Sequence, residues 1–148
     1  MKENDGMKLP CCAAIMICCF GVGAALAQDF PRDRELLLDA APMRPSKRIP
    51  SLTLAADGRA TFDLWCRSIA GRIEPAADGS LTVTAETPDL AQAPLPEMQG
   101  PGQCSDQRQQ ADLALLAALT QSNRWEAAGE GVALTGGPQP LRFRPATN

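Results

Sequence analysis

Few side chains in this 148-residue sequence could do chemistry, because it contains no histidine and no tyrosine. Without histidine, a Ser-His-Asp triad, a Cys-His pair and a histidine-ligated zinc site are excluded. Asp63, Glu74 and Glu86 could in principle form paired carboxylates for acid–base catalysis. Each falls on the polar side of an alternating segment, which is more typical of a solvated sheet face. We therefore expect no catalytic residues, no metal site and no cofactor.

The N-terminal segment has the features of a secretory signal. Residues 11–26 are uncharged and mostly apolar, and the segment ends in Ala25-Leu26-Ala27, a small-x-small cleavage pattern. We predict a cleaved signal peptide at residues 1–27, starting at Met1 or Met7, a flexible lead-in at 28–34 and one domain at 35–148. A retained anchor and a lipid anchor are the alternatives, although the apolar run is short for a membrane span. The expected location is periplasmic or secreted, with no stable membrane span after cleavage.

Cleavage would remove four of the six cysteines and leave Cys66 and Cys104. An exported protein with two cysteines most simply forms one disulfide, which here would close a loop of about 40 residues. A reactive thiol is the alternative, and it needs a basic neighbour that lowers its pKa. Arg67 is adjacent to Cys66, so this alternative remains open at the level of the sequence.

The positive charges show one dense cluster, at Arg44, Lys47 and Arg48. The net charge of −3 and the absence of a larger basic patch argue against nucleic acid as a partner. The cluster is either a solvated loop or a contact for an anionic surface. Trp65 is out of phase with the apolar face of its expected strand, so it either packs at the rim or faces a ligand. We take these four residues as possible partner-binding residues.

The elements that must position these residues are short strands and one helix. Apolar side chains alternate with polar ones around Asp57-Gly58 and Asp78-Gly79, which are hairpin signals. A proline-rich and glycine-rich stretch at 87–103 then leads to Cys104. Ser105 or Asp106 can cap a helix over 107–120, whose expected apolar face is Leu113, Leu115, Leu116 and Leu119. Further strands are expected at 51–54, 59–65, 71–74, 80–86, 124–127, 131–135 and 140–144.

This order of elements predicts a mainly β fold with one helix. Short antiparallel strands joined by glycine turns favour a small sheet that curls into a partial barrel. The single amphipathic helix would pack on that sheet. The sequence shows neither the alternation of strands and helices typical of βαβ folds nor an internal repeat of 20–50 residues.

The ordered set of segments resembles the META domain of the HslJ-like heat-shock family over about residues 35–145. The resemblance is carried by Ile49 to Leu54 with Asp57-Gly58-Arg59, by the two cysteines, by Leu115 to Leu119 with Arg124-Trp125-Glu126, and by Val132 to Leu134 with Leu141 to Phe143. The chain departs from the family pattern at Trp65 and Arg67, which replace a glycine and an asparagine beside the first cysteine. The resemblance implies a disulfide between the two cysteines, a barrel-like fold with a helix and links to envelope stress, and it does not imply an enzyme.

The functional expectation is an exported, non-catalytic domain that binds an envelope component or a protein partner. We expect it to be a monomer. The alternative is a carrier that holds a small apolar ligand inside the barrel.

Overall fold

The computed structural model describes residues 29–86 and 94–147. The predicted signal peptide at 1–27, with its four cysteines, lies outside the described residues, as do residues 87–93 of the proline-rich stretch. Within the described part, no helix is long and apolar enough to cross a bilayer.

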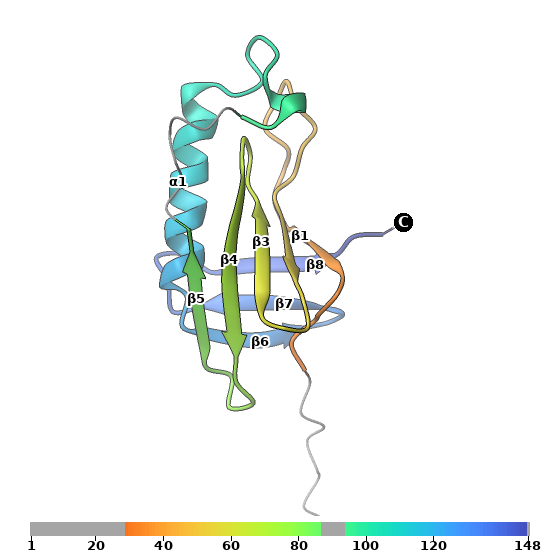
Figure 1. Cartoon of the computed structure of the whole chain (residues 1–148), viewed down its shortest axis with the longest axis vertical. Helices are drawn as coiled ribbons and strands as arrows, with labels where there is room; N and C mark the ends of the chain where they lie inside the picture. Colours follow the sequence, from red (N-terminus) through yellow and green to blue (C-terminus); the bar gives the residue numbers. More distant parts are fainter. Residues whose placement is uncertain (1–28, 87–93, 148) are drawn as a thin grey trace, which may run out of the picture.

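Eight strands form one antiparallel sheet, which confirms the predicted mainly β fold (Figure 1). The order across the sheet is β5-β4-β3-β2-β1-β8-β7-β6. The strands are β1 (Glu35–Leu38), β2 (Ser51–Leu54), β3 (Arg59–Asp63), β4 (Ser68–Pro75), β5 (Leu81–Ala85), β6 (Arg124–Ala128), β7 (Gly131–Thr135) and β8 (Leu141–Pro145). A 3-10 turn, η1 (Pro96–Met98), and one helix, α1 (Asp106–Gln121), complete the fold.

The hairpin turns form where Asp-Gly pairs occur in the sequence. Gly58 and Gly79 have φ angles of 85° and 81°, a region that glycine enters without steric cost. In each turn the preceding aspartate accepts a hydrogen bond from the backbone N–H two residues later, at 3.0 Å for Asp57 and 2.8 Å for Asp78. These local bonds fix the β2–β3 and β4–β5 connections.

The sheet nearly closes into a barrel between β5 and β6. Leu81 N donates to Asn123 O at 2.9 Å, and Trp125 N donates to Gly79 O at 2.9 Å. An isolated bridge between Ser80 and Arg124 lies between these two bonds. We call this group of contacts the seam. Beyond the seam the two edge strands separate, and α1 packs against β5 (Figure 1).

The helix was predicted in the right place, and three of the four leucines expected on its covered face, Leu115, Leu116 and Leu119, lie in or against the core. Leu113, which we expected on that face, is 49% exposed. Buried positions instead follow a stripe of Arg108, Asp112, Leu115, Ala118 and Leu119. This stripe keeps the spacing of three or four residues that places side chains on one side of a helix. Leu113 was misplaced because the prediction followed the leucines and ignored polar residues that share the covered face.

Buried apolar side chains from seven strands meet α1 in one core, and the partly buried Trp125 of β6 packs against it. The core residues include Leu36, Leu52, Leu54, Phe62, Ile73, Val83, Leu119, Val132, Leu134 and Phe143. Most of these residues alternate with exposed ones along their strands, as the period of two predicted.

The lead-in also belongs to this packing, although we expected it to be flexible. Phe30 is 4% exposed and joins the core, and Pro31 is buried. Asp33, with a φ of 54°, donates its N–H to Leu54 O at 2.7 Å and accepts from Ala56 N at 3.2 Å. Residues 29–34 are therefore attached to the β2–β3 turn.

Candidate binding surface at the disulfide end of the barrel

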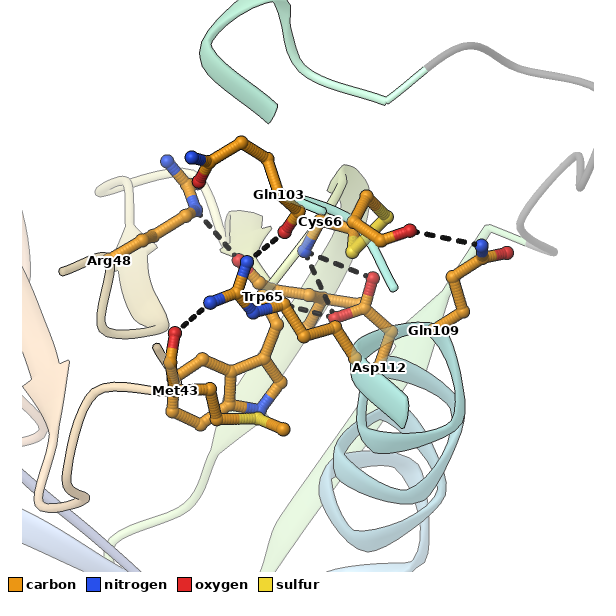
Figure 2. Close-up of a disulfide and its surroundings, with 10 residues drawn as sticks. Met43, Arg48, Trp65, Cys66, Gln103, Gln109 and Asp112 are labelled. Carbon is orange, nitrogen blue, oxygen red and sulfur yellow. Dashed lines mark hydrogen bonds between the residues drawn. A yellow bond between two sulfur atoms is a disulfide. The ribbon is translucent and has the colours of Figure 1, made fainter. Parts of the chain in front are cut away.

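The predicted disulfide joins Cys66, in the turn between β3 and β4, to Cys104, just before α1 (Figure 2). The two Cα atoms are 5.6 Å apart, and Cys66 is fully buried. The bond connects residues 38 positions apart and therefore ties the proline-rich connection to the sheet. Leu95 strengthens this attachment, since its N–H donates to Cys66 O at 3.1 Å. Met98 in η1 is also buried.

Asp112 fixes the same turn from the side of the helix. Its carboxylate accepts a hydrogen bond from Trp65 N at 2.7 Å and from Cys66 N at 3.2 Å (Figure 2). The β3–β4 turn has no strand partner for these two donors, so the carboxylate supplies the acceptor that buried backbone groups require.

Burial raises the pKa of Asp112 to about 6, from an ordinary value of 3.8. The backbone donors of Trp65 and Cys66 oppose this rise, as do the charges of Arg67 and Arg48. Removal of the charged form from water outweighs these contributions. The carboxyl group therefore titrates closer to neutrality than an exposed aspartate.

Arg108 connects the helix to the loop between β1 and β2, which spans residues 39–50. Its guanidinium donates to Met43 O and to Gln103 O (Figure 2). The residue is 1% exposed, so the charge lies under the loop. The loop and the connection before Cys104 are thus held by the same side chain.

The loop is also tied to the turn before the disulfide. Arg48 Nε donates to Leu64 O at 2.8 Å, and its Nη2 lies 3.5 Å from Asp63 Oδ1. Asp63 is therefore half-buried beside a cation, while Glu74 and Glu86 lie exposed on other rows of the sheet. Asp63, Glu74 and Glu86 therefore do not form one cluster of carboxylates.

The predicted partner-binding residues gather at this end, but their exposure differs. Arg44 and Lys47 are exposed on the loop, whereas Arg48 is half-buried. Trp65 is 8% exposed. It was assigned to the polar side of a strand, but β3 ends at Asp63, and residues 64–67 are all buried in the turn. Of the four, Arg44 and Lys47 thus present their side chains most freely.

Arg108 and Asp112 were missed as functional candidates. Both are in register with Leu115 and Leu119, so a polar pair within the apolar stripe was the available signal. Such a position indicates that a charged side chain is buried and bound to a specific partner.

Arg67, in the β3–β4 turn, is a third buried charged residue at this end of the barrel, with Arg108 and Asp112. It is 8% exposed, and its Nε has no hydrogen-bond partner among the described residues. It lines a space of about 10 Å³ with Leu64, Asp112 and Leu116. That volume is about what one water molecule needs.

At this end the buried Asp112 and Arg108 bond to other parts of the fold, whereas Arg44 and Lys47 are exposed. Among the described residues, the one carboxylate with a raised pKa is that of Asp112, which is covered and already accepts two backbone hydrogen bonds. Arg44 and Lys47 are the groups at this end that can reach a partner, because the cations beneath them are tied to the fold. Comparison with protein-family models, curated proteins and solved structures finds no match to this chain.

Proposed function

We propose that the protein is an exported META/HslJ-like domain that acts without catalysis, by binding an anionic component of the cell envelope through the 39–50 loop. The observation that carries this proposal is the fixed loop itself. Arg108 donates to Met43 O of the loop, and Arg48 of the loop donates to Leu64 O in the β3–β4 turn, while Arg44 and Lys47 remain exposed. A loop held in one conformation loses little entropy on binding, which favours its use as a contact.

Location and family support each other in this proposal. A disulfide is stable in an oxidising compartment, which fits the predicted periplasmic or secreted location. The eight-stranded near-barrel with one helix fits the fold that the family resemblance implies. The link to envelope stress rests on that resemblance.

The test is binding of the protein to vesicles, with anionic phospholipid as the probe and zwitterionic vesicles for comparison. The double variant Arg44→Ala/Lys47→Ala should bind anionic vesicles roughly 30-fold more weakly, since each basic residue near such a surface contributes about 1 kcal/mol. The matched control is Arg34→Ala/Arg144→Ala, which removes the same charge from exposed residues outside the loop.

Equal weakening in both double variants would mean that net charge, not the loop, attracts the protein to the surface. Equal binding of the unmodified protein to anionic and zwitterionic vesicles would also contradict the proposal. Raised salt should weaken genuine loop binding, because it screens exposed charges.

The carrier of a small apolar ligand was the alternative expectation. Core side chains such as Leu36, Phe62 and Leu134 occupy the interior of the described sheet. The space beside Asp112 is too small for more than water. No observation in the described part of the chain favours the carrier over binding through the 39–50 loop.

A further inference from the structure

A hollow of about 700 Å³ lies on the outward face of the sheet over β2 to β5, away from the 39–50 loop. It is lined by Thr53, Ala55, Arg59, Ala60, Thr61, Ala70, Gly71, Arg72, Thr84, Ala85 and Glu86. Its volume falls within the ~300–1,000 Å³ typical of small-molecule sites. None of the functions considered so far uses this surface.

The register of the sheet explains the shape of the hollow. Thr53 pairs with Thr61, and Thr61 pairs with Ala70, so small side chains form one row across three strands. The next row contains Arg59 and Arg72, whose long side chains stand beside it. A floor of small residues next to arginines leaves room for a ligand to approach the sheet.

The floor carries hydroxyl groups that the fold does not use. The side chains of Thr53, Thr61 and Thr84 form no hydrogen bond with any described residue. Each hydroxyl can donate one hydrogen bond and accept two. Three such groups in one hollow suit a ligand that itself presents several donors and acceptors.

The charges around the hollow nearly cancel. Arg59 Nε lies 2.6 Å from Asp57 Oδ2, and Arg72 Nε lies 3.7 Å from Glu74 Oε1. Glu86 adds a negative charge to the lining. There is thus no surplus of positive charge for an anionic ligand, and the electrostatics favour a neutral one.

We propose that this hollow binds a neutral, polyhydroxylated ligand, namely a short segment of a glycan chain. The hydroxyl edges of sugar rings would bond to the threonine hydroxyls, Glu86 and the arginines. The C–H faces of the rings would contact the methyl groups of Ala55 and Ala70, which also line the hollow. This site is separate from the loop and does not depend on the proposed function.

No aromatic ring lines the hollow to stack on a sugar, and the hollow is open to water. We therefore expect a dissociation constant on the order of 1 mM. The test is an NMR titration of the ¹⁵N-labelled protein with cellotriose and with chitotriose, which separate plain from N-acetylated glycans. Trigalacturonate serves as the anionic comparison.

The neutral sugars should shift the amide signals of Thr53, Thr61, Ala70 and Thr84, and trigalacturonate should bind more weakly. Thr61→Val removes a hydroxyl from the floor while keeping the size of the side chain. One lost hydrogen bond of about 1 kcal/mol corresponds to roughly fivefold weaker binding. Thr82→Val is the matched control, because Thr82 is an exposed threonine of β5 outside the hollow.

Four results would overturn the proposal. The first is an absence of shifts at 20-fold the expected dissociation constant of either neutral sugar. The second is a set of shifts centred on residues outside the hollow, and the third is tighter binding of trigalacturonate than of the neutral sugars. Equal weakening by Thr61→Val and Thr82→Val would likewise show that the hollow is not the site.

Discussion

At one end of the barrel a disulfide and a buried carboxylate hold the β3–β4 turn to α1, whereas at the other end an aromatic pair covers the seam. Phe30 packs edge-on against Trp125 there, with ring centroids 5.3 Å apart. Trp125 Nε1 also donates to Ala76 O at 3.1 Å, in the β4–β5 turn. Both ends thus attach a segment that is distant in the sequence to a turn of the sheet.

The difference between the two ends lies in what each is sensitive to. The disulfide end depends on the redox state of two cysteines and on the ionisation of Asp112. The seam end depends on apolar burial and neutral hydrogen bonds, which neither reductant nor mild acid alters. We therefore expect the stability of the disulfide end, but not that of the seam end, to change with redox conditions and pH. Five variants test this division.

The largest effect is expected from Cys66→Ala combined with Cys104→Ala. Loss of the cross-link should lower the free energy of unfolding by about 4 kcal/mol, because the unfolded chain regains loop entropy. Urea denaturation with and without reductant measures this. Reductant should lower the stability of the parent protein and leave the double variant unchanged. Equal stability of the oxidised parent and the variant would contradict the structural role of the disulfide.

Phe30→Ala should cost about 3 kcal/mol, because it removes a buried aromatic side chain from the core at the seam. The loss should be the same in reductant, and it should add to that of the cysteine variant if the ends are independent. Arg32→Ala is the control, since its exposed side chain only bonds to Ala55 O and Ala56 O. A clearly non-additive result would show that the two ends are coupled.

Asp112→Ala should lower the free energy of unfolding by about 2 kcal/mol. It leaves the buried N–H groups of Trp65 and Cys66 without an acceptor. Asp112→Asn keeps an acceptor oxygen and should retain most of that stability, as measured by urea denaturation at pH 7. If both variants were equally unstable, the backbone bonds would not be the reason for the burial of this residue.

The pH dependence of stability should also change with Asp112. Its pKa in the folded protein, about 6, is above the ordinary value, so folding favours the protonated form. The contribution of Asp112 to the free energy of unfolding is fully present below about pH 4 and is lost as the pH rises through about 6. In Asp112→Asn, the decrease in the free energy of unfolding between about pH 4 and pH 7 should be smaller by about 1–2 kcal/mol, after allowance for solvent screening. Phe30→Ala should keep the slope, and a parallel loss of slope in that variant would break the division between the ends.

The smallest effect is expected from Trp125→Phe. It keeps an aromatic ring beside Phe30 and removes the donor to Ala76 O. Thermal unfolding should show a loss of about 0.5–1 kcal/mol, since the bond is solvent-accessible. A loss as large as that of Phe30→Ala would mean that the hydrogen bond, and not apolar packing, closes the seam.

Much of the sheet could be predicted from the sequence, because its signals are local. The Asp57-Gly58 and Asp78-Gly79 turns and the period of two located seven of the eight strands to within a few residues, whereas β1 was not predicted. The disulfide followed from the count of cysteines once a signal peptide was assumed. Leu113, by contrast, was placed on the wrong side of α1, since only contact with β5 determines which stripe of the helix is covered.

The candidate site could be predicted only in part. Arg44 and Lys47 form a charge cluster that is visible in the sequence, whereas the role of Arg108 depends on a bond to Met43, which is 65 positions away. The same holds for Asp112, whose partners Trp65 and Cys66 precede it by 46 or more positions. Local patterns carry no information about such pairs.

The sequence by itself determined seven of the eight strands, the helix, the two cysteines of the domain and the absence of histidine chemistry, because each depends on neighbouring residues or on composition. Only the tertiary structure decided that Trp65 and Phe30 are buried, that Asp112 is a shielded carboxyl with a raised pKa, and that threonines of three strands line one hollow. These features arise when distant segments pack together and remove particular groups from water. The free energy of that burial depends on partners that only the folded chain brings into contact.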